Sequence, residues 1–524
     1  MSITDKKEVN RMQKLKTAII DIGSNTVRLV MYQYDKDEGL HEFGNMKTVA
    51  RLRTHLLPSG EMSEEGMRTL SETLVSFKQI LEDYGVTDIQ TVATAAVRQA
   101  SNNERIVEKM KEDSGIKIDI LSEEEEAYFG FLAVVNSMDT PSAVTIEIGG
   151  GATEITLFKN KKLLKTHSFP FGTVSLKQKF VKGAIMDDEE RKLLHAYVKQ
   201  QFETLSWIRD VNLPIVAIGG SARNVAQVHQ QQVDYPISGV HQYEMHQDDL
   251  MELKKDLGSM TFEQLKQLDG LSSDRADIIV PAIEVFTTLM AVVGTTSFQL
   301  SKKGLREGLI IDRVLQGDAE AFDKYNVFAE NARRLAFQYG RSEEETKTLA
   351  SLSKQFYVEC CNLELFPFHE EDLELIQRAA KVFSLGEYIE LDSSSQHTFY
   401  LLANQSIAGM NHVNRVKLAL LASYKNRDYF RRFAAPFMSW FTREELKKLR
   451  DFGALLKFIY GLNVSKRNVV KKIELELVQD RIHIHIVTKD RAVAEVYQAE
   501  RTKKHIERVF KRQVVIHFEE ERWK

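Results

Sequence analysis

Two segments of the chain, residues 20–29 and 146–155, carry the same order of residue types. In each, a β-branched run contains a carboxylate, Asp21 or Glu147, and is followed by a tight turn of small residues and a second apolar run. This order predicts two strand–loop–strand hairpins. Glycine lets a backbone approach an anion closely and point N–H groups at it. Two such loops facing each other could hold one phosphate group from both sides.

The candidate phosphate ligands belong to these two turns and are Gly23, Ser24, Asn25, Thr26, Gly149, Gly150, Gly151, Ala152 and Thr153. A carboxylate beside phosphate would repel it unless a divalent cation lay between them, so Asp21 and Glu147 predict a hard metal ion such as Mg²⁺. Two ordinary hairpins with glycine turns are the structural alternative. The shared position of the carboxylate in both copies favours a common site.

Three further segments could act on a bound phosphate. A strand at 91–93 runs into a helix start that ends on Arg98, whose guanidinium could reach phosphoryl oxygens. Ser122 caps a helix that opens with four glutamates, residues 123–126. Acidic residues favour a helix N-terminus for electrostatic reasons, but one of the four could still point into the site. A third strand-to-glycine turn opens a helix and adds Gly220, Ser221 and Arg223 as anion ligands.

Length and composition predict a helix-rich cytoplasmic protein with several domains. The chain has 524 residues, 43% of them hydrophobic, and eight prolines. No stretch approaches the roughly 18 to 20 uncharged apolar residues of a membrane helix, so no membrane contact is expected. Residues 1–16 are polar and lack the apolar core of a signal peptide. Cys360 and Cys361 lack metal-ligand spacing, so buried reduced thiols are expected.

Hydrophobic periodicity divides the chain into three predicted parts, an α/β part up to residue 317, a helical part over 318–464 and a small α+β part over 465–524. Up to about residue 312, strands alternate with helices; the strands are expected at 17–22, 27–34, 89–93, 118–121, 143–148, 154–159 and 215–218. The helices of this part are expected at 63–84, 103–112, 124–137, 187–209 and 277–293. Consecutive helices follow at 319–339, 343–361, 372–385, 413–423 and 444–462. The last segment predicts two alternating strands, a helix over 492–511 and a strand at 514–518.

Charge is unevenly distributed along the chain. Residues 465–524 contain 15 Lys and Arg against 10 Asp and Glu, a net charge of +5 in a chain whose total is −4. The total argues against a protein that coats nucleic acid, while the basic tail either attracts another polyanion or is a solvated helix face. His483 and His485 face away from the isoleucines of their strand, where a metal site is geometrically possible and a plain surface is the commoner case.

Six motifs in order resemble the exopolyphosphatase/guanosine pentaphosphate phosphatase (Ppx/GppA) family over residues 17 to about 312. They are Asp-Ile-Gly-Ser-Asn-Thr, Ala-Thr-Ala-Ala-Val-Arg, Ser-Glu-Glu-Glu-Glu-Ala, Ile-Gly-Gly-Gly-Ala-Thr-Glu, Phe-Gly-Thr-Val at 171–174 and Gly-Gly-Ser-Ala-Arg-Asn. The resemblance implies an actin-like fold of the sugar-kinase and Hsp70 type, with two related α/β lobes, 1–140 and 141–317, and an active site in the cleft between them. It also implies Mg²⁺-dependent hydrolysis of the terminal phosphoryl group of inorganic polyphosphate, or of the 5′ γ-phosphate of guanosine pentaphosphate. K⁺ is a further candidate cofactor.

The family's catalytic glutamate falls on Glu126, with Glu125 as the alternative if the register differs by one. The family's metal-binding carboxylates fall on Glu147 and Glu154. Position 147 departs from the family, which has aspartate there. The additional methylene moves the carboxylate by about 1.5 Å, which matters because Mg²⁺ demands near-octahedral geometry.

The helical region resembles the HD-like domain of longer family members. No His-Asp dipeptide occurs in the chain, so this domain is expected to be degenerate. By resemblance it would help to form a homodimer and a basic channel, with candidates Arg415, Lys417, Lys425, Arg427, Arg431, Arg432, Lys503, Lys504 and Arg508. We expect a processive exopolyphosphatase. The alternatives are a guanosine pentaphosphate phosphatase, a sugar or acetate kinase of the same fold, and a non-catalytic module that binds polyphosphate or nucleic acid. Guanosine penta- or tetraphosphate is the corresponding candidate ligand.

Overall fold

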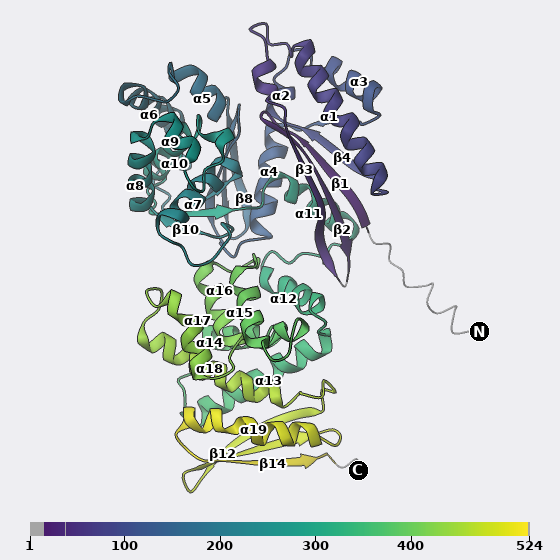
Figure 1. Cartoon of the computed structure of the whole chain (residues 1–524), viewed down its shortest axis with the longest axis vertical. Coiled ribbons are helices and arrows are strands. Elements are labelled where there is room, and N and C mark those ends of the chain that lie inside the picture. Colours follow the sequence, from purple (N-terminus) through teal and green to yellow (C-terminus); the bar gives the residue numbers. More distant parts are fainter. Residues whose placement is uncertain (1–14, 37, 522–524) are drawn as a thin grey trace, which may run out of the picture. The chain divides into compact units, whose positions relative to one another are not determined.

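A computed structural model describes residues 15–36 and 38–521, which form two compact units (Figure 1). Unit 1 contains the described residues up to Tyr235 together with Val240–Val327. Unit 2 contains Pro236–Gly239 and the described residues from Phe328 onward. Each unit has its own secondary-structure composition, and the two are described separately.

The first lobe of unit 1 is a five-stranded sheet in the order β3-β2-β1-β4-β5. Its strands are β1 (Leu15–Ile22), β2 (Thr26–Asp35), β3 (Gly39–Val49), β4 (Asp88–Ala93) and β5 (Asp119–Ile120). Its helices are η1 (Leu52–His55), α1 (Glu64–Asp83), α2 (Ala95–Arg98) and α3 (Asn103–Ser114). Leu70, Leu74 and Phe77 of α1 bury one face of this sheet because they recur at helical spacing on one side of the helix.

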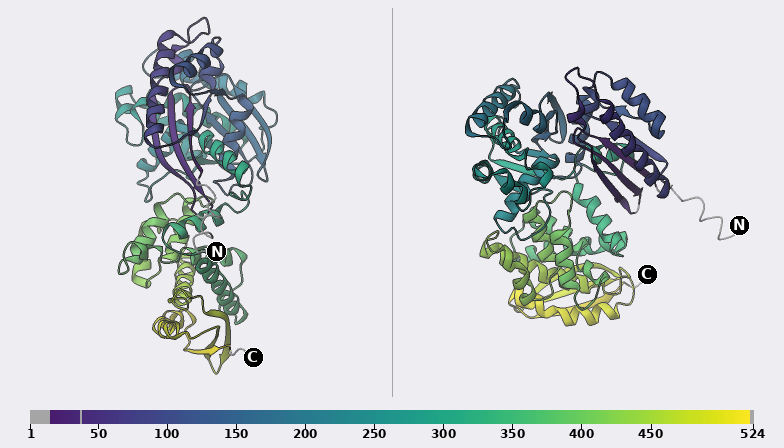
Figure 2. Two further views of the ribbon diagram at one scale, coloured as in Figure 1. Left: turned by 90° about the vertical axis from the view of Figure 1, so that its right-hand side faces the viewer. Right: turned by 45° about the horizontal axis from the view of Figure 1, so that its top comes forward.

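The second lobe is a six-stranded sheet in the order β10-β11-β9-β6-β7-β8. Its strands are β6 (Ala143–Ile148), β7 (Thr153–Lys159), β8 (Lys162–Phe169), β9 (Ile215–Ile218), β10 (Glu244–His246) and β11 (Ser297–Ser301). Its helices are α5 (Thr173–Phe180), α6 (Asp188–Glu203), α7 (Gly219–Gln232), α8 (Gln247–Ser259), α9 (Phe262–Gln267), η2 (Ser273–Arg275) and α10 (Ile279–Val293). Apolar side chains of α6, α7 and α10 pack on one face of this sheet. The two sheets are separate layers in Figure 2.

Two helices that pack against each other join the lobes. α4 (Glu123–Val135) covers the free face of the second sheet through Phe131, Val134 and Val135. α11 (Leu305–Gly317) covers the free face of the first sheet through Leu309 and Ile310. The helices cross so closely that a Cβ on Gly308 would lie 1.9 Å from the carbonyl oxygen of Phe129. Glycine is therefore required at this crossing for steric reasons.

Each predicted lobe, 1–140 or 141–317, contains a helix that packs on the sheet of the other lobe. α4 precedes residue 141 but packs on the second sheet, whereas α11 lies within 141–317 but packs on the first sheet. The hydroxyl of Tyr34 in β2 donates a hydrogen bond of 2.9 Å to Asp318, just beyond the predicted limit. The predicted limits remain predictions, because the sequence does not reveal which sheet a helix covers.

Most predicted elements are present, with errors at edges and connections. β3, β8, β10 and β11 were not predicted, and the helix expected to begin at residue 319 begins at Val327. β3 and β8 are edge strands whose residues are mostly half-buried or exposed, so they lack the apolar run that indicates a buried strand. The missed helices were α5, α8, α9, α11, α15 and α17.

Unit 2 combines a helical layer with a small sheet. Its helices are α12 (Val327–Gln338), α13 (Glu343–Asn362), α14 (Glu370–Lys381), η3 (Leu385–Tyr388), α15 (Ser394–Asn404), α16 (His412–Ala422), α17 (Arg427–Ala434), η4 (Ala435–Phe437) and α18 (Arg443–Gly461). They are followed by β12 (Val470–Val478), β13 (Arg481–Thr488), α19 (Val493–Phe510) and β14 (Val514–Glu520). β13 pairs antiparallel with β12 and parallel with β14, and α19 runs along this sheet (Figure 1). The predicted order of two strands, a helix and a third strand is confirmed.

Two smaller expectations concern the cysteines and the membrane. Cys360 and Cys361 are free thiols; Cys360 is buried, which raises its pKa, and Cys361 is half-buried. In the described part of the chain, no helix combines the length and apolar character needed to cross a membrane.

Candidate active site

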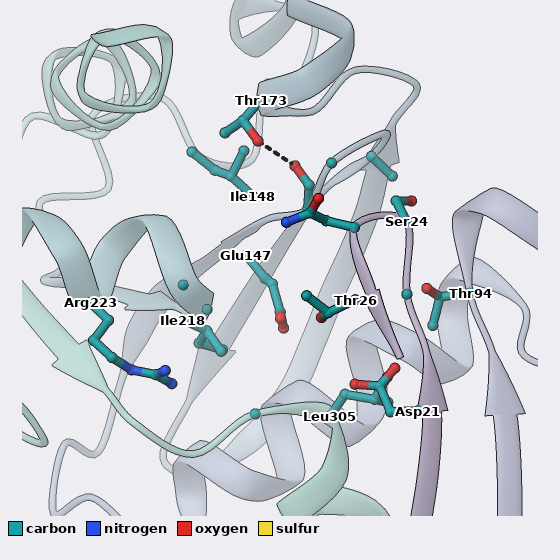
Figure 3. Close-up of a pocket in the computed structure, with 18 of the residues that line it drawn as sticks. Asp21, Ser24, Thr26, Thr94, Glu147, Ile148, Thr173, Ile218, Arg223 and Leu305 are labelled. Carbon is teal, nitrogen blue, oxygen red and sulfur yellow. Dashed lines mark hydrogen bonds between the residues drawn. The ribbon is translucent and has the colours of Figure 1, made fainter. Parts of the chain in front are cut away.

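A cavity of about 430 Å³ lies between the two lobes of unit 1 (Figure 3). Four carboxylates line it: Asp21, Glu126, Glu147 and Glu154. Six cations also line it: Arg28, Lys47, Arg223, Arg275, Lys302 and Arg306. The wall therefore carries a net positive charge, which suits an anionic ligand.

The two predicted loops have the same turn and face each other. The N–H of Gly23 donates to the carbonyl of Thr26 at 3.0 Å, and the N–H of Gly149 donates to the carbonyl of Ala152 at 2.9 Å. A Cβ on Gly150 would lie 3.0 Å from Cβ of Ser24, so the loops approach within van der Waals contact. Every residue of 23–26 and 149–152 lines the cavity.

Gly172 supports the second loop from behind. A Cβ there would lie 2.4 Å from the carbonyl oxygen of Gly149 and 2.7 Å from the backbone of Gly150 and Gly151. We expect Gly172→Ala to displace this loop, to lower the free energy of unfolding by about 1–3 kcal/mol and to weaken phosphate binding. Urea denaturation and phosphate titration test this. Gly183→Ala is the control, because a Cβ on the exposed Gly183 would meet only the carbonyl of Ile185 at 3.6 Å; equal effects of the two changes would contradict the prediction.

The third predicted loop contributes in part. Gly220 and Arg223 line the cavity at the start of α7. Ser221 is 2% exposed and accepts a hydrogen bond from Arg275, and Thr153 is fully buried and donates to the carbonyl of Phe171. Neither Ser221 nor Thr153 lines the cavity, so their hydroxyls support the loops rather than face a ligand.

Glu126 and Arg98 form a pair at the inner wall. A guanidinium N–H of Arg98 donates to Glu126 at 2.9 Å, and the same nitrogen lies 2.9 Å from the carbonyl of Leu121. Arg98 does not line the cavity and holds the carboxylate of Glu126; contact of its guanidinium with a phosphoryl group stays a prediction. The neighbouring Glu125 accepts the N–H of Ser122 at 2.8 Å in a capping box and is exposed. Of the two register alternatives, only Glu126 reaches the cavity.

Burial disfavours the charged forms of the carboxylates at the inner end. It raises the pKa of Glu126 despite the opposing effect of Arg98. Burial, followed by repulsion from Glu126 and Asp21, raises the pKa of Glu147 to about 8. Burial and the charges of Glu126 and Glu147 raise the pKa of Glu154. A bound cation would stabilise the charged forms of these three carboxylates.

The donor set fits Mg²⁺. Glu147 and Glu154 are register partners on β6 and β7, and within the described residues the Glu147 carboxylate has neither a hydrogen-bond donor nor an ion-pair partner. Asp21 is different because its Oδ2 accepts from Arg306 at 2.7 Å. In the described chain no three His, Cys, Asp or Glu side chains form a ready metal-binding group. Mg²⁺ commonly uses one or two carboxylates plus waters and substrate phosphates, so Glu147 and Glu154 suffice.

Three glycines leave room for the longer side chain at position 147. Cβ atoms built on Gly130, Gly219 and Gly304 would each lie 3.5–3.8 Å from a carboxylate oxygen of Glu147. Gly219 also has a φ of +93°, which favours glycine. Figure 3 shows Glu147 extending toward the middle of the pocket, between Asp21 and Arg223. The space beside these three glycines therefore accommodates the glutamate that replaces the family's aspartate at position 147.

Sequence reasoning missed five of the six cations. Arg28, Lys47, Arg275, Lys302 and Arg306 come from separate segments outside the predicted glycine turns. Burial lowers the pKa of Arg28, Arg223 and Arg275, and a neighbouring guanidinium lowers each further. An anion bound among them would relieve this repulsion. Only Arg28 carried a usable signal, because it lies two residues after Thr26 on the same face of its strand.

Residues 31–317 match the Ppx/GppA phosphatase family, and residues 329–500 match Ppx/GppA phosphatase, domain III. The chain belongs to the Ppx/GppA phosphatase family. Its predicted architecture, an actin-like two-lobed core followed by a helical domain and a small α+β segment, is confirmed.

Several relatives and solved structures resemble this family member. A guanosine-5′-triphosphate,3′-diphosphate pyrophosphatase of Vibrio parahaemolyticus is 24% identical over 418 residues, 77% of this chain and 79% of that protein. A bifunctional 3-dehydroquinate synthase/phosphatase of Fusobacterium nucleatum is 23% identical over 60% of this chain, which spans 48% of that relative's length. The Aquifex aeolicus family member has 25% identity and a TM-score of 0.52, covering 58% of this chain and 99% of its own. An exopolyphosphatase from Cytophaga hutchinsonii has 23% identity and the same TM-score over 58% of this chain and 98% of its own.

The predicted channel residues of this Ppx/GppA protein all lie in unit 2. Arg415 is 1% exposed and donates to the carbonyls of Gln405 and Ser238, so it is not available to a ligand and its prediction is wrong. Lys417 pairs with Glu445, Lys425 donates to the carbonyl of Asp392, and Lys503 pairs with Glu500. Arg427, Arg431, Arg432, Lys504 and Arg508 are exposed.

Lys457, a half-buried lysine of α18, lies near several of these cations. Burial lowers the pKa of Lys457 to about 8, and Lys504, Lys425 and Arg501 contribute. The folded protein binds a proton at Lys457 less readily than the unfolded chain, whose lysine pKa is 10.5. The free energy of unfolding is therefore highest above pH 10.5 and decreases as the pH falls to about 8. We therefore expect the wild type to gain up to about 3 kcal/mol relative to Lys457→Met between pH 8 and 10.5.

Urea midpoints measured across this pH range test the lysine prediction. Lys447→Met is the control, because Lys447 is exposed on the same helix. A wild-type to Lys457→Met difference that stays constant with pH would contradict it.

The three histidines of the C-terminal sheet do not form a ready metal site. His483 Nδ1 lies 2.9 Å from His517 Nε2, and the rings of His485 and His517 stack at 4.8 Å. No group of three His, Cys, Asp or Glu side chains in the described part of the chain is arranged to hold a metal ion. The isoleucines of β13 are buried and the histidines half-buried, as their alternation predicts.

Proposed function

We propose that this protein is an exopolyphosphatase that hydrolyses the terminal phosphoanhydride of inorganic polyphosphate and releases orthophosphate. The observation that carries the proposal is the composition of the cavity wall. Six cations and two glycine loops surround a carboxylate cluster, and none of the described residues lining the cavity is aromatic. A nucleobase is commonly held by apolar and aromatic side chains, whereas a chain of phosphates needs only cations and N–H donors.

The reaction is a single in-line displacement. Glu126, held by Arg98, orients a water molecule and accepts its proton as the water oxygen bonds to the terminal phosphorus. The bond from that phosphorus to the bridging oxygen breaks, and the shortened chain leaves with the bonding electrons. The loop N–H groups and Arg223 hold the equatorial oxygens, on which the charge is spread. Mg²⁺ held by Glu147 and Glu154 would neutralise part of this charge.

The exposed cations of unit 2, Arg427, Arg431, Lys504 and Arg508, are proposed to bind polyphosphate. A long polyanion gains affinity from each cation that it contacts and loses it with salt. A homodimer and a degenerate HD-like fold of the helical domain remain part of the proposal through the resemblance.

Guanosine pentaphosphate hydrolysis is the second candidate, because the curated relatives that span both units carry that activity in their names. The experiment is phosphate release with Mg²⁺ from long polyphosphate, triphosphate, guanosine pentaphosphate and ATP in parallel. Faster release from polyphosphate than from guanosine pentaphosphate, lost in Glu126→Gln, supports the proposal. Faster release from guanosine pentaphosphate selects the second candidate. No release from any substrate would indicate a binding module.

A further inference from the structure

A row of charges crosses the first sheet from the carboxylate cluster outward. Asp21 on β1 is the register partner of Arg28 on β2, and Arg28 is the partner of Lys47 on β3. All three line the cavity. Neighbouring strands lie about 4.8 Å apart, so Lys47 stands about 10 Å from the strand that carries Asp21. The side chain of Asp21 is 15% exposed and that of Lys47 is 38% exposed, so the row runs from the reaction centre toward the outer part of the cavity.

At the outer end of this row, Lys47 forms an ion pair with a residue of the second lobe. Its ammonium lies 3.4 Å from Oδ2 of Asp274 in η2, with the two side chains 38% and 25% exposed. Exposed ion pairs contribute little to stability because water competes for both charges. The ammonium can thus exchange the Asp274 carboxylate for another anion with a small change in free energy.

We propose that Lys47 is a substrate-positioning residue whose ammonium leaves Asp274 and binds an outer phosphoryl group of the substrate. This inference rests on the proposed function, because it requires a substrate with several phosphates in line. When the cavity holds no substrate, the Asp274 carboxylate pairs with the Lys47 ammonium. When substrate binds, this carboxylate competes with the outer phosphoryl group for the ammonium. The pair then favours chains long enough to reach Lys47.

The alternative is that the pair only fastens the two lobes together. The two alternatives predict different effects on substrate binding. If the ion pair only holds the lobes together, replacing either partner removes the same contact and has the same effect. If Lys47 positions substrate, Lys47→Met weakens binding, whereas Asp274→Asn strengthens it by freeing the ammonium.

The experiment measures kcat and KM on long polyphosphate with Mg²⁺. We expect Lys47→Met to raise KM by about three- to tenfold with kcat changed less than twofold, Lys47→Arg to restore most of the affinity, and Asp274→Asn to lower KM. Asp274→Asn should lower KM less when combined with Lys47→Met, because Asp274 then acts only on the neighbouring Arg275. Lys78→Met is the control, since Lys78 pairs with Glu82 on α1 outside the cavity. Shifts of KM in the same direction for Lys47→Met and Asp274→Asn, or no shift, would overturn the inference.

A binding measurement separates this inference from the proposed function. In Glu126→Gln protein, polyphosphate affinity is titrated at several salt concentrations. Adding Lys47→Met should reduce the slope of log affinity against log salt by about one, the value for one lost phosphate contact. An unchanged slope would refute the role of Lys47 even if the enzyme hydrolyses polyphosphate. If polyphosphate binds but is not hydrolysed by the wild type, the proposed function fails while this test still reports on Lys47.

Discussion

Glu126→Gln is expected to lower kcat for phosphate release by a factor of about 10² to 10⁴, the range typical of a lost general base. Glutamine keeps the shape of the side chain but cannot accept the proton of the attacking water. The loops and the cavity cations are untouched, so we expect polyphosphate to bind with nearly unchanged affinity. Steady-state turnover and equilibrium titration measure the two quantities separately.

Glu125→Gln is the matched control for Glu126. The two residues are adjacent, but Glu125 accepts the N–H of Ser122 and is exposed, whereas Glu126 lines the cavity beside Arg98. We expect Glu125→Gln to keep near-normal turnover. Loss of activity in Glu125→Gln together with normal activity in Glu126→Gln would mean that the catalytic register is wrong.

Glu147→Gln is expected to have the second large effect, on Mg²⁺. The Glu147 carboxylate has no ion-pair partner within the described chain and lies near the carboxylates of Glu126 and Asp21, so its replacement removes a free oxygen donor from the cluster. We expect Mg²⁺ affinity to fall at least tenfold, as seen for the loss of groups that hold a metal ligand in place. Calorimetric titration with Mg²⁺ measures this without turnover.

Glu147→Asp distinguishes the charge at this position from its reach. Aspartate restores the charge but withdraws the carboxylate from Gly130, Gly219 and Gly304, beside which it lies. We expect an Mg²⁺ affinity between those of the wild type and Glu147→Gln. Equal Mg²⁺ affinity in the wild type and Glu147→Gln would remove Glu147 from the metal site.

Regular local patterns explain why much of the fold was predictable. α1 and α10 were predicted because their apolar residues recur at helical spacing, and β6 and β9 because they are short buried apolar runs. β3 and β8 were missed because an edge strand exposes much of its surface and needs few apolar residues. α11 was missed because it follows an unpredicted strand and carries charged residues in its first turn.

The sequence by itself determined the two phosphate-sized loops and their carboxylates, because a turn depends on a few adjacent residues and glycine at the tight positions. It also placed Glu126 among four candidates next to a serine cap. Only the tertiary structure decided which charges surround the loops. Arg306 meets Asp21 across 285 positions of sequence, and Lys47 meets Asp274 across 227. The first pair forms because α11 packs back on the first sheet, and the second forms between the two lobes; no local pattern encodes either arrangement.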